Sequence, residues 1–444
     1  MYLKKLRLIN FRRFSGDHTI EFDRKLTVFA ANNGAGKTSM LDAIAYAFGP
    51  FLTQFPKIKG NAPTDTDVSF TREKDQPFAL ISAELYKKDE NCNISVSTEW
   101  DRIKRLNPAA KAIRNVQNKL LGMGYEVKGH TDIHHEAYYL LDKIDTEIIF
   151  PIIAYYGTGR ILNEIPPRGR AFAKEFHRYQ AYEDCLSSNS KFGRLFSHFY
   201  TLEDLERREI TAQKDFMHRN PQLEAIRKAI TACIPEYELP KTKLAPFRFV
   251  LTSLSDGKEY DIKLLSDGYK TTISMVMDIA MRMVQANPHL GTEVLQTPGI
   301  VLIDEIELHL HPSWQQRILL DLQRTFPNVQ FICTSHSPQV LSTVKQESIR
   351  LITDEGNILT GEQVGVHTYG AQSYLIMEDL MKVSPNPRVS EVEELKAKLM
   401  QRLKVGDLQI DDSEIVKLEN YVGKEDPFVQ NLKASTAKHT RRHA

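Results

Sequence analysis

The chain has 444 residues, of which 41% are hydrophobic and 26% are charged, and its formal net charge is +1. These values are typical of a globular protein, and the near-neutral charge excludes a global basic field for nucleic acid, so any DNA-binding surface must be a local patch. The length predicts two or three structural units. The 4 cysteines lie far apart and form no C-x-x-C pair, which argues against a structural zinc site and is typical of a reducing compartment. Because no apolar run approaches the roughly 18 residues of a membrane span and no signal peptide is recognised, we expect a cytoplasmic protein.

The first 50 residues predict two strands followed by a strand–turn–helix unit. Residues 3–8 and 19–22 have the apolar content and alternation of strands. Residues 26–30 then predict a buried strand, and residues 40–48 a helix with a period of about 3.6. A glycine-rich turn between that strand and that helix directs backbone N–H groups and the positive end of the helix dipole at a phosphate. The residues predicted to bind the nucleotide there are Asn32, Asn33, Gly34, Ala35, Gly36, Lys37, Thr38 and Ser39.

Two side chains of this turn predict ATP and Mg²⁺ as the cofactors. Lys37 is placed to reach the β- and γ-phosphates, and Thr38 to put its hydroxyl on Mg²⁺. Ala31 departs from the G-x-x-x-x-G-K-[ST] pattern, which has glycine at the first position. Because alanine does not adopt a positive φ without strain, we expect the turn to begin in a conformation that an ordinary L-residue tolerates.

The middle of the chain alternates between strand and helix patterns. Residues 51–70 have the composition of a loop, and residues 78–100 predict an antiparallel strand group. A weakly patterned helical stretch over 101–145, a buried strand over 148–156 and a charged helical region over 165–235 follow. Strands 248–251 and 260–262 then form a hairpin around a turn at 255–258. The last part, from residue 374 to about 422, is predicted to be helical, and the basic tail that contains Arg441 and Arg442 is predicted to be disordered.

Three further motifs carry chemistry. Residues 299–303 predict a buried parallel strand that delivers Asp304 for Mg²⁺ and Glu305 to polarise a water for attack on the γ-phosphate. Another buried strand ends at His336, which could donate to the γ-phosphate. Ser266 is a plausible N-cap of an apolar helix, and Gly268 leaves backbone amides bare for an anion. The predicted catalytic residues are therefore Glu305 and His336, and the predicted metal ligands are Thr38 and Asp304.

Together these motifs resemble a known family. The phosphate loop, the Leu265-Ser266-Asp267-Gly268 signature, the strand that ends in Asp304-Glu305 and the strand-end His336 resemble the ABC-type ATPase head shared by SMC-like and RecF-like DNA-associated proteins. The opening Leu6-x-Leu8-x-Asn10-Phe11-Arg12-x-Phe14 is similar to the start of that family. The stretches 155–160 and 304–312 resemble stand-alone ATPases of bacterial anti-phage defence operons, and residues 423–428 are similar to the ATPase subunit of the Septu system, whose partner is an HNH nuclease.

The resemblance implies an α/β fold: an ABC/SMC-like P-loop ATPase head with a mixed sheet, an antiparallel β-lobe, a helical insertion and a helical C-terminal region. The expected parts are 1–160 for the first half of the head, 161–244 for the insertion, 245–370 for the second half, and 371–444 for a helical region that binds a partner or an oligomer. In that family two heads dimerise head to tail, so that Lys37 of one copy and Ser266 with Gly268 of the other grip one nucleotide. The implied function is an ATP-driven switch that acts with an HNH nuclease subunit on DNA in phage defence.

Several alternatives stay open on sequence alone. A metal site at His130, His134, His135 and Glu136 is weighed against adjacent histidines that point to different faces, and a DNA-facing patch over 102–119 against a solvated helix face. Following the resemblance, His309 and His311 are subunit contacts or simply loop residues, and Gln76 is a weak candidate for a Mg²⁺ contact. The competing functions are a transporter ATPase, an ATPase–nuclease of the overcoming-lysogenization type, which needs a Toprim domain after His336, and a RecF-like repair protein.

Overall fold

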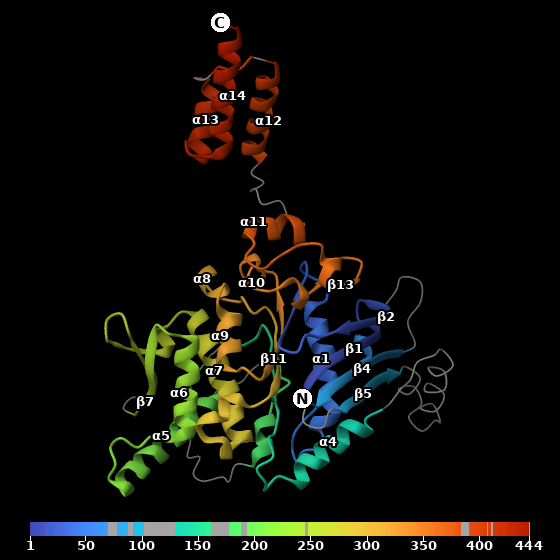
Figure 1. Ribbon diagram of the computed structural model, residues 1–444, viewed down its shortest axis with the longest axis vertical. Coiled ribbons are helices and arrows are strands. Elements are labelled where there is room, and N and C mark those ends of the chain that lie inside the picture. The colour runs from blue at the N-terminus through green and yellow to red at the C-terminus, as the bar shows by residue number, and fades with distance from the viewer. Residues whose placement is uncertain are drawn as a thin grey trace. The chain divides into compact units, whose positions relative to one another are not determined.

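The computed structural model (Figure 1) describes residues 1–69, 78–87, 92–101, 129–160, 177–187, 193–244, 247–382, 390–405, 407–409 and 412–443. The chain divides into two compact units, Met1–Met381 and Lys382–Ala444. The second unit therefore begins later than residue 371, where the sequence analysis placed its boundary.

The core of the first unit is a six-stranded sheet in the order β13-β12-β3-β11-β10-β6, parallel except for the edge strand β13. The bounds are β3 Leu26–Ala30, β6 Ile152–Tyr156, β10 Gly299–Ile303, β11 Val329–Ser335, β12 Ile349–Ile352 and β13 Ile358–Thr360. Every residue of β3, β6, β10 and β11 is buried, which explains why these strands are continuous apolar runs in the sequence. The mixed sheet of the predicted fold class is confirmed.

Two antiparallel sheets accompany the central sheet, in the orders β2-β1-β4-β5 and β7-β8-β9. Their bounds are β1 Tyr2–Phe11, β2 Phe14–Glu21, β4 Phe78–Lys87, β5 Cys92–Asp101, β7 Tyr237–Leu244, β8 Phe247–Ser253 and β9 Glu259–Asp261. The first is the predicted antiparallel lobe, and β8 with β9 is the predicted hairpin. The prediction that residues 161–244 are a helical insertion is wrong at its end, because β7 pairs with β8 there.

The helices of the first unit pack on the sheets and on one another. They are α1 Lys37–Leu52, α4 Thr131–Asp142, α5 Gly193–Gln213, α6 Pro221–Cys233, α7 Asp267–Ala286, α8 Pro312–Gln315, α9 Ile318–Thr325, α10 Pro338–Leu341 and α11 Ser373–Leu375, with a π-helical turn at Ile376–Leu380. Short 3-10 turns lie at Asp65–Asp67, Arg178–Tyr182, Ile262–Leu264, Pro288–Gln296, Gln346–Ser348 and Gly361–Val364. Helix α1 packs on β11 of the central sheet and on β4 and β5 of the lobe, whereas α6, α7 and α9 pack together (Figure 1).

Where the structure describes the second unit, it has three helices, α12 Ser390–Val405, α13 Ser413–Val422 and α14 Pro427–His443. Its core is a small cluster of aliphatic side chains, namely Leu395, Leu399, Leu408, Ile415, Leu418, Val429 and Leu432. The predicted disorder of the basic tail is wrong, because α14 continues through His443. Among the described residues of both units, no helix is both long enough and apolar enough to cross a membrane.

Candidate active site

Three neighbouring strands bring the predicted motifs to one edge of the central sheet. Strand β11 lies between β3 and β10, and all three run parallel. Ile303 at the end of β10 is level with Cys333, and Ala30 at the end of β3 is level with Ser335. The phosphate loop, the Asp304–Glu305 pair and His336 therefore follow strand ends that meet at the same edge, where open α/β sheets bind their ligands.

The phosphate loop takes the conformation that its glycines permit. Gly34 and Gly36 have φ of 75° and 99°, and Gly36 is the N-cap of α1. A Cβ on Gly36 would lie 2.7 Å from Cδ of Arg13 and 3.0 Å from the Phe14 ring, so a side chain there would force these neighbours to shift. Ala31 is not among the residues with positive φ, which confirms the prediction that the loop begins in an ordinary conformation.

Lys37 lies inside the loop that precedes it. Its Nζ donates to the carbonyl of Ala31 at 2.8 Å and to that of Asn32 at 3.2 Å, and the residue is only 7% exposed. Burial lowers the pKa of the ammonium, whereas the nearby carboxylates of Glu305, Glu307 and Asp304 act in the opposite direction. The loop thus holds a cation at its centre and faces it with carboxylates, an arrangement that suits a polyphosphate bound through a metal ion.

Asp304 joins the helix start to the sheet edge. Its Oδ2 accepts from the Thr38 hydroxyl at 2.8 Å, and its Oδ1 accepts from the Thr334 hydroxyl at 2.6 Å. The residue is 2% exposed. Thr38 and Asp304 therefore present a hydroxyl and a carboxylate oxygen side by side, which are donors that suit Mg²⁺. Among the described residues no group of three or more His, Cys, Asp or Glu could hold a metal ion. Mg²⁺ sites in proteins usually combine one or two carboxylates with phosphate and water oxygens.

Glu305 has a left-handed backbone that two neighbours hold in place. Its φ is +47°, a conformation that is strained for a residue with a side chain. Its N–H donates to the Thr334 hydroxyl at 2.7 Å, and its carbonyl accepts from Arg160 Nη2 at 2.6 Å. Arg160 is 1% exposed and also donates from Nη1 to the carbonyls of Asp304 at 2.5 Å and Gly157 at 3.0 Å. Burial lowers the pKa of this guanidinium, and nearby carboxylates oppose that change.

His336 lies beside the buried carboxylate of Glu307. Glu307 Oε1 accepts from the backbone N–H of His336 at 2.6 Å and lies 2.9 Å from His336 Nδ1. The hydrogen bond to Glu307 raises the pKa of His336 above its ordinary value. Burial acts to raise the pKa of Glu307, but the hydrogen bonds from His336 lower it below its ordinary value.

A second hydrogen-bond network holds α1 in place through Asp42. Arg12 donates to Asp42 at 2.6 Å and to Asp67 at 2.7 Å, and Tyr155 donates to the other oxygen of Asp42 at 2.9 Å. Burial acts to lower the pKa of Arg12, but the bonds to Asp67 and Asp42 raise it above its usual range. This network joins the turn after β1, the 3-10 turn Asp65–Asp67, α1 and β6, and so sets the position of the residues at the start of α1.

Ser266 and Gly268 lie at the start of α7. Ser266 is the N-cap, as predicted, but its exposed side chain makes no capping hydrogen bond. A Cβ on Gly268 would lie 2.5 Å from the carbonyl oxygen of His309. The start of α7 is thus packed on the segment that follows Glu305, and its glycine is required there for close approach.

Other predicted candidates take no part in this arrangement. Glu136 forms a 2.9 Å ion pair with Lys87, and His130, His134 and His135 belong to no metal-binding group among the described residues. The His311 ring accepts from the Ser313 N–H at the start of α8. Gln76 and the basic stretch 102–119 lie outside the described residues.

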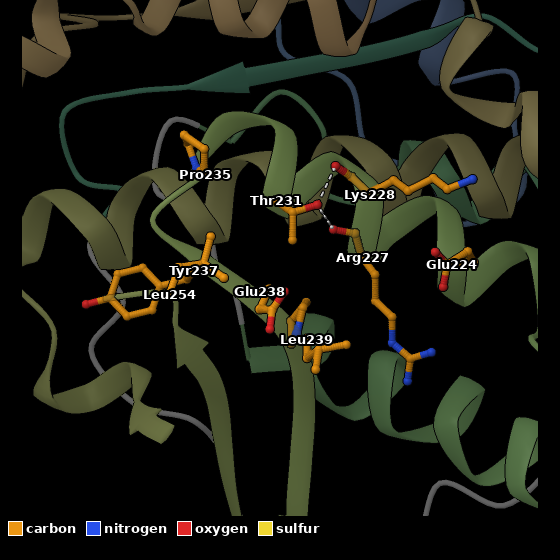
Figure 2. Close-up of a pocket in the computed structure, with 10 residues that line it drawn as sticks. Glu224, Arg227, Lys228, Thr231, Pro235, Tyr237, Glu238, Leu239 and Leu254 are labelled. Carbon is orange, nitrogen blue, oxygen red and sulfur yellow. Dashed lines mark hydrogen bonds between the residues drawn. The ribbon is translucent and has the colours of Figure 1, made fainter. Parts of the chain in front are cut away.

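A separate hollow of about 390 Å³ lies between α6 and β7 (Figure 2). Two of its polar side chains are engaged within the protein: the Thr231 hydroxyl donates to the carbonyls of Arg227 and Lys228, and the Arg227 side chain pairs with Glu206 at 3.0 Å. None of the predicted site residues lines it.

The roles of Arg160, Thr334 and Glu307 could not be predicted from the sequence. A signal was present in each case, since Arg160 follows a buried strand and a glycine-rich turn, Thr334 is a polar residue in an apolar strand, and Glu307 follows Glu305 by two positions. None of these signals shows which backbone groups the side chains reach.

The fold and the site define a P-loop ATPase with its catalytic edge on a mostly parallel sheet. A family model described as AAA domain matches residues 5–238, more than half of the chain, and the chain belongs to this family. A second model, described as AAA ATPase domain, matches residues 179–341 and so includes Asp304, Glu305 and His336.

The chain is also similar to individual proteins. A protein named Retron Vc95 probable ATPase, from Vibrio cholerae, is 29% identical over 79% of this chain and 73% of its own length. Septu protein PtuA of Bacillus thuringiensis is 32% identical over 30% of this chain and 34% of its own length. A solved SMC head bound to the C-winged helix domain of ScpA is similar with a TM-score of 0.44 and 14% identity, covering 81% of this chain and 96% of that one. The resemblance to SMC-like ATPases and to the Septu ATPase that the motifs predict is confirmed.

Proposed function

We propose that this chain hydrolyses ATP to ADP and phosphate at the edge formed by β3, β10 and β11. The observation that carries the proposal is Asp304, whose two oxygens join Thr38 of the phosphate loop to Thr334 beside Glu305. One buried carboxylate thereby connects the phosphate loop to the residue beside the proposed base. Such a connection matters because catalysis of phosphoryl transfer depends mainly on the correct placement of the reacting groups.

Each residue has a separate task in the proposed reaction. The loop amides and Lys37 bind the phosphates, and Thr38 with Asp304 would hold Mg²⁺. When bound, Mg²⁺ neutralises charge on the phosphate oxygens. Glu305 accepts a proton from the attacking water, and its backbone is held by Thr334 and Arg160. His336 donates a hydrogen bond to the γ-phosphate.

The test is Glu305→Gln, which keeps the size of the side chain and removes its basicity. We expect ATP turnover to fall by about 100-fold or more, because general bases contribute factors of this order, while ATP binding is retained. Phosphate release and binding of a fluorescent ATP analogue measure the two properties. Glu347→Gln is the matched control, since its side chain is 71% exposed on the surface. An unchanged turnover rate in Glu305→Gln would exclude Glu305 as the base.

We further propose that the active form is a head-to-tail dimer, in which Ser266 and Gly268 of one copy complete the site of the other. Two features of the chain support this arrangement. Ser266 is exposed and free of any capping bond at the start of a long helix, and Gly268 packs on His309 in the segment that follows Glu305. A helix start of this kind offers backbone amides to an anion.

The names of two relatives support a role in phage defence, because one is a retron ATPase and another a Septu protein. We propose that the chain is the ATPase subunit of a cytoplasmic defence complex whose partner is an HNH nuclease acting on DNA. On this proposal the purified chain alone cuts no DNA with any divalent metal, and cleavage appears when the nuclease is supplied. Metal-dependent cleavage by the chain alone would instead indicate a self-contained ATPase–nuclease.

A further inference from the structure

Glu307 and His336 form a contact that the proposed reaction does not require. One oxygen, Oε1, receives both the backbone N–H of His336 at 2.6 Å and the ring nitrogen Nδ1 at 2.9 Å. The two bonds on a single acceptor fix the ring relative to the backbone at the end of β11. The Glu307 side chain is 5% exposed, whereas that of His336 is 45% exposed.

Burial of the Glu307 carboxylate has a cost in free energy of folding. Its second oxygen, Oε2, is buried and has no hydrogen-bond partner among the described residues. A buried polar atom without a partner carries a penalty of about 1–3 kcal/mol in free energy of folding. The same backbone and ring contacts could be accepted by an uncharged amide, so Gln at this position would keep both contacts and remove only the negative charge.

We propose that Glu307 is a positioning residue that keeps Nδ1 of His336 protonated and bonded to its carboxylate, so that Nε2 is presented as a hydrogen-bond donor at the proposed catalytic edge. Nδ1 must carry a proton to bond a carboxylate, and the adjacent negative charge stabilises a second proton on Nε2. The inference rests on the proposed ATPase function, because it assigns Nε2 to a bound phosphate.

The charged groups around His336 come from two elements. Glu307 and Glu305 lie in the segment after β10 and favour the imidazolium, whereas Lys37 of α1 disfavours it. Glu307 has the largest effect, and the pKa of His336 is raised above the ordinary 6.5. The protonated ring is therefore retained at higher pH than in an isolated histidine, and it is lost as the pH rises through the raised pKa.

Glu307→Gln tests the inference, because the amide oxygen can still accept both bonds but carries no charge. We expect His336 to titrate at lower pH in this variant than in the wild type. The measurement is the pH titration of the His336 ring resonance in ¹³C-histidine-labelled full-length protein without nucleotide, with the resonance identified by its loss in His336→Gln. An unchanged titration would overturn the inference, and this result does not depend on whether the chain hydrolyses ATP.

The ATPase pH profile supplies the second measurement. At low pH, where His336 is protonated in both proteins, Glu307→Gln is expected to retain kcat close to that of the wild type. As the pH rises above 6.5, its kcat falls earlier, by on the order of tenfold relative to wild type, with little change in KM. A rate ratio that is constant over the pH range would assign Glu307 a merely structural role.

A double mutant separates the two residues. In His336→Gln the amide nitrogen donates at every pH, so adding Glu307→Gln should change kcat much less than it does in the wild type. An equal loss in both backgrounds would contradict the inference. Absence of turnover in the wild-type protein would exclude the proposed ATPase, but the ring titration would still report the Glu307–His336 contact.

Discussion

Arg160 is a buried cation whose described hydrogen bonds all end on backbone carbonyls. It bonds those of Gly157, Asp304 and Glu305 and is 1% exposed. Its position next to the carboxylates of Asp304 and Glu305 reduces the cost of burying its charge. Arg160 therefore holds the backbone of both residues without contacting either side chain through a hydrogen bond.

Arg160→Met is expected to lower the free energy of unfolding by about 1–3 kcal/mol, because buried carbonyls lose their donor. It is also expected to lower ATP turnover by about 100-fold, because Glu305 leaves its strained conformation and displacements near 1 Å have effects of this size. Thermal unfolding and phosphate release measure the two effects.

Arg350→Met is the matched control for this change. Arg350 is 6% exposed and donates to the carbonyls of Glu21, Glu347 and Ile349, which lie outside the site. We expect a similar loss of stability with nearly normal turnover of the folded protein. Equal losses of turnover in both variants would show that Arg160 acts only through general stability.

At the scale of single residues, the sequence predicts those site residues whose side chains are proposed to contact the nucleotide or the metal ion directly. Lys37, Thr38, Asp304 and His336 follow buried strands, and parallel strands end at a common edge. Thr334 could not be predicted in the same way, because its two bonds depend on the left-handed turn at Glu305. A non-glycine residue with positive φ leaves no trace in composition or periodicity.

At the scale of elements, the turn into α1 requires glycine at position 36. Gly36→Ala is expected to abolish ATP binding, because a Cβ at 2.7 Å from Arg13 Cδ and 3.0 Å from the Phe14 ring displaces the loop. The positive φ of 99° adds strain of about 1–2 kcal/mol. Titration with a fluorescent ATP analogue measures the loss.

Gly257→Ala provides the control, since Gly257 has φ of +68° in a hairpin turn and nothing lies within 4 Å of an added Cβ. The alanine there carries the same kind of strain but meets no neighbour, so we expect a small loss of stability and unchanged ATP binding. If Gly36→Ala binds ATP as well as Gly257→Ala does, the close approach of Arg13 to the loop does not determine its conformation.

Strands with an uninterrupted hydrophobic pattern are predicted from the sequence, whereas a strand whose hydrophobic pattern is interrupted is not. Strands β3, β10 and β11 are buried throughout and appear as apolar runs. Strand β7 was missed because its register shifts between Glu238 and Lys241, where Leu239 has a φ of +48° and Pro240 lacks an N–H. The bulge breaks the alternation that identifies a strand.

At the scale of the whole molecule, the proposed dimer predicts that two inactive variants can complement each other. Lys37→Ala removes the loop cation, and Ser266→Arg blocks the start of α7, so each variant alone should lack ATPase activity. Mixed together, they can form a dimer with one site built from two intact halves. We expect the mixture to recover part of the wild-type rate in a steady-state assay.

The control mixture contains Lys37→Ala and Gly36→Ala, which both damage the same half and should not complement each other. Recovery in the first mixture alone would support shared sites. If neither mixture recovers activity although both variants fold and associate, each chain must supply a complete site.

The hydrogen bond between Thr38 and Asp304 joins residues separated by 266 positions in the chain. The free energy needed to close a loop grows only slowly with its length, so this separation costs little once folding is complete. The separation in the chain does, however, determine at what stage of synthesis the hydrogen bond can form. During synthesis the phosphate loop leaves the ribosome long before β10 and β11 exist. A nascent chain therefore carries half of the proposed metal-binding pair for most of its translation, and on the proposed function full ATP affinity is acquired only after the second half of the sheet has joined the first.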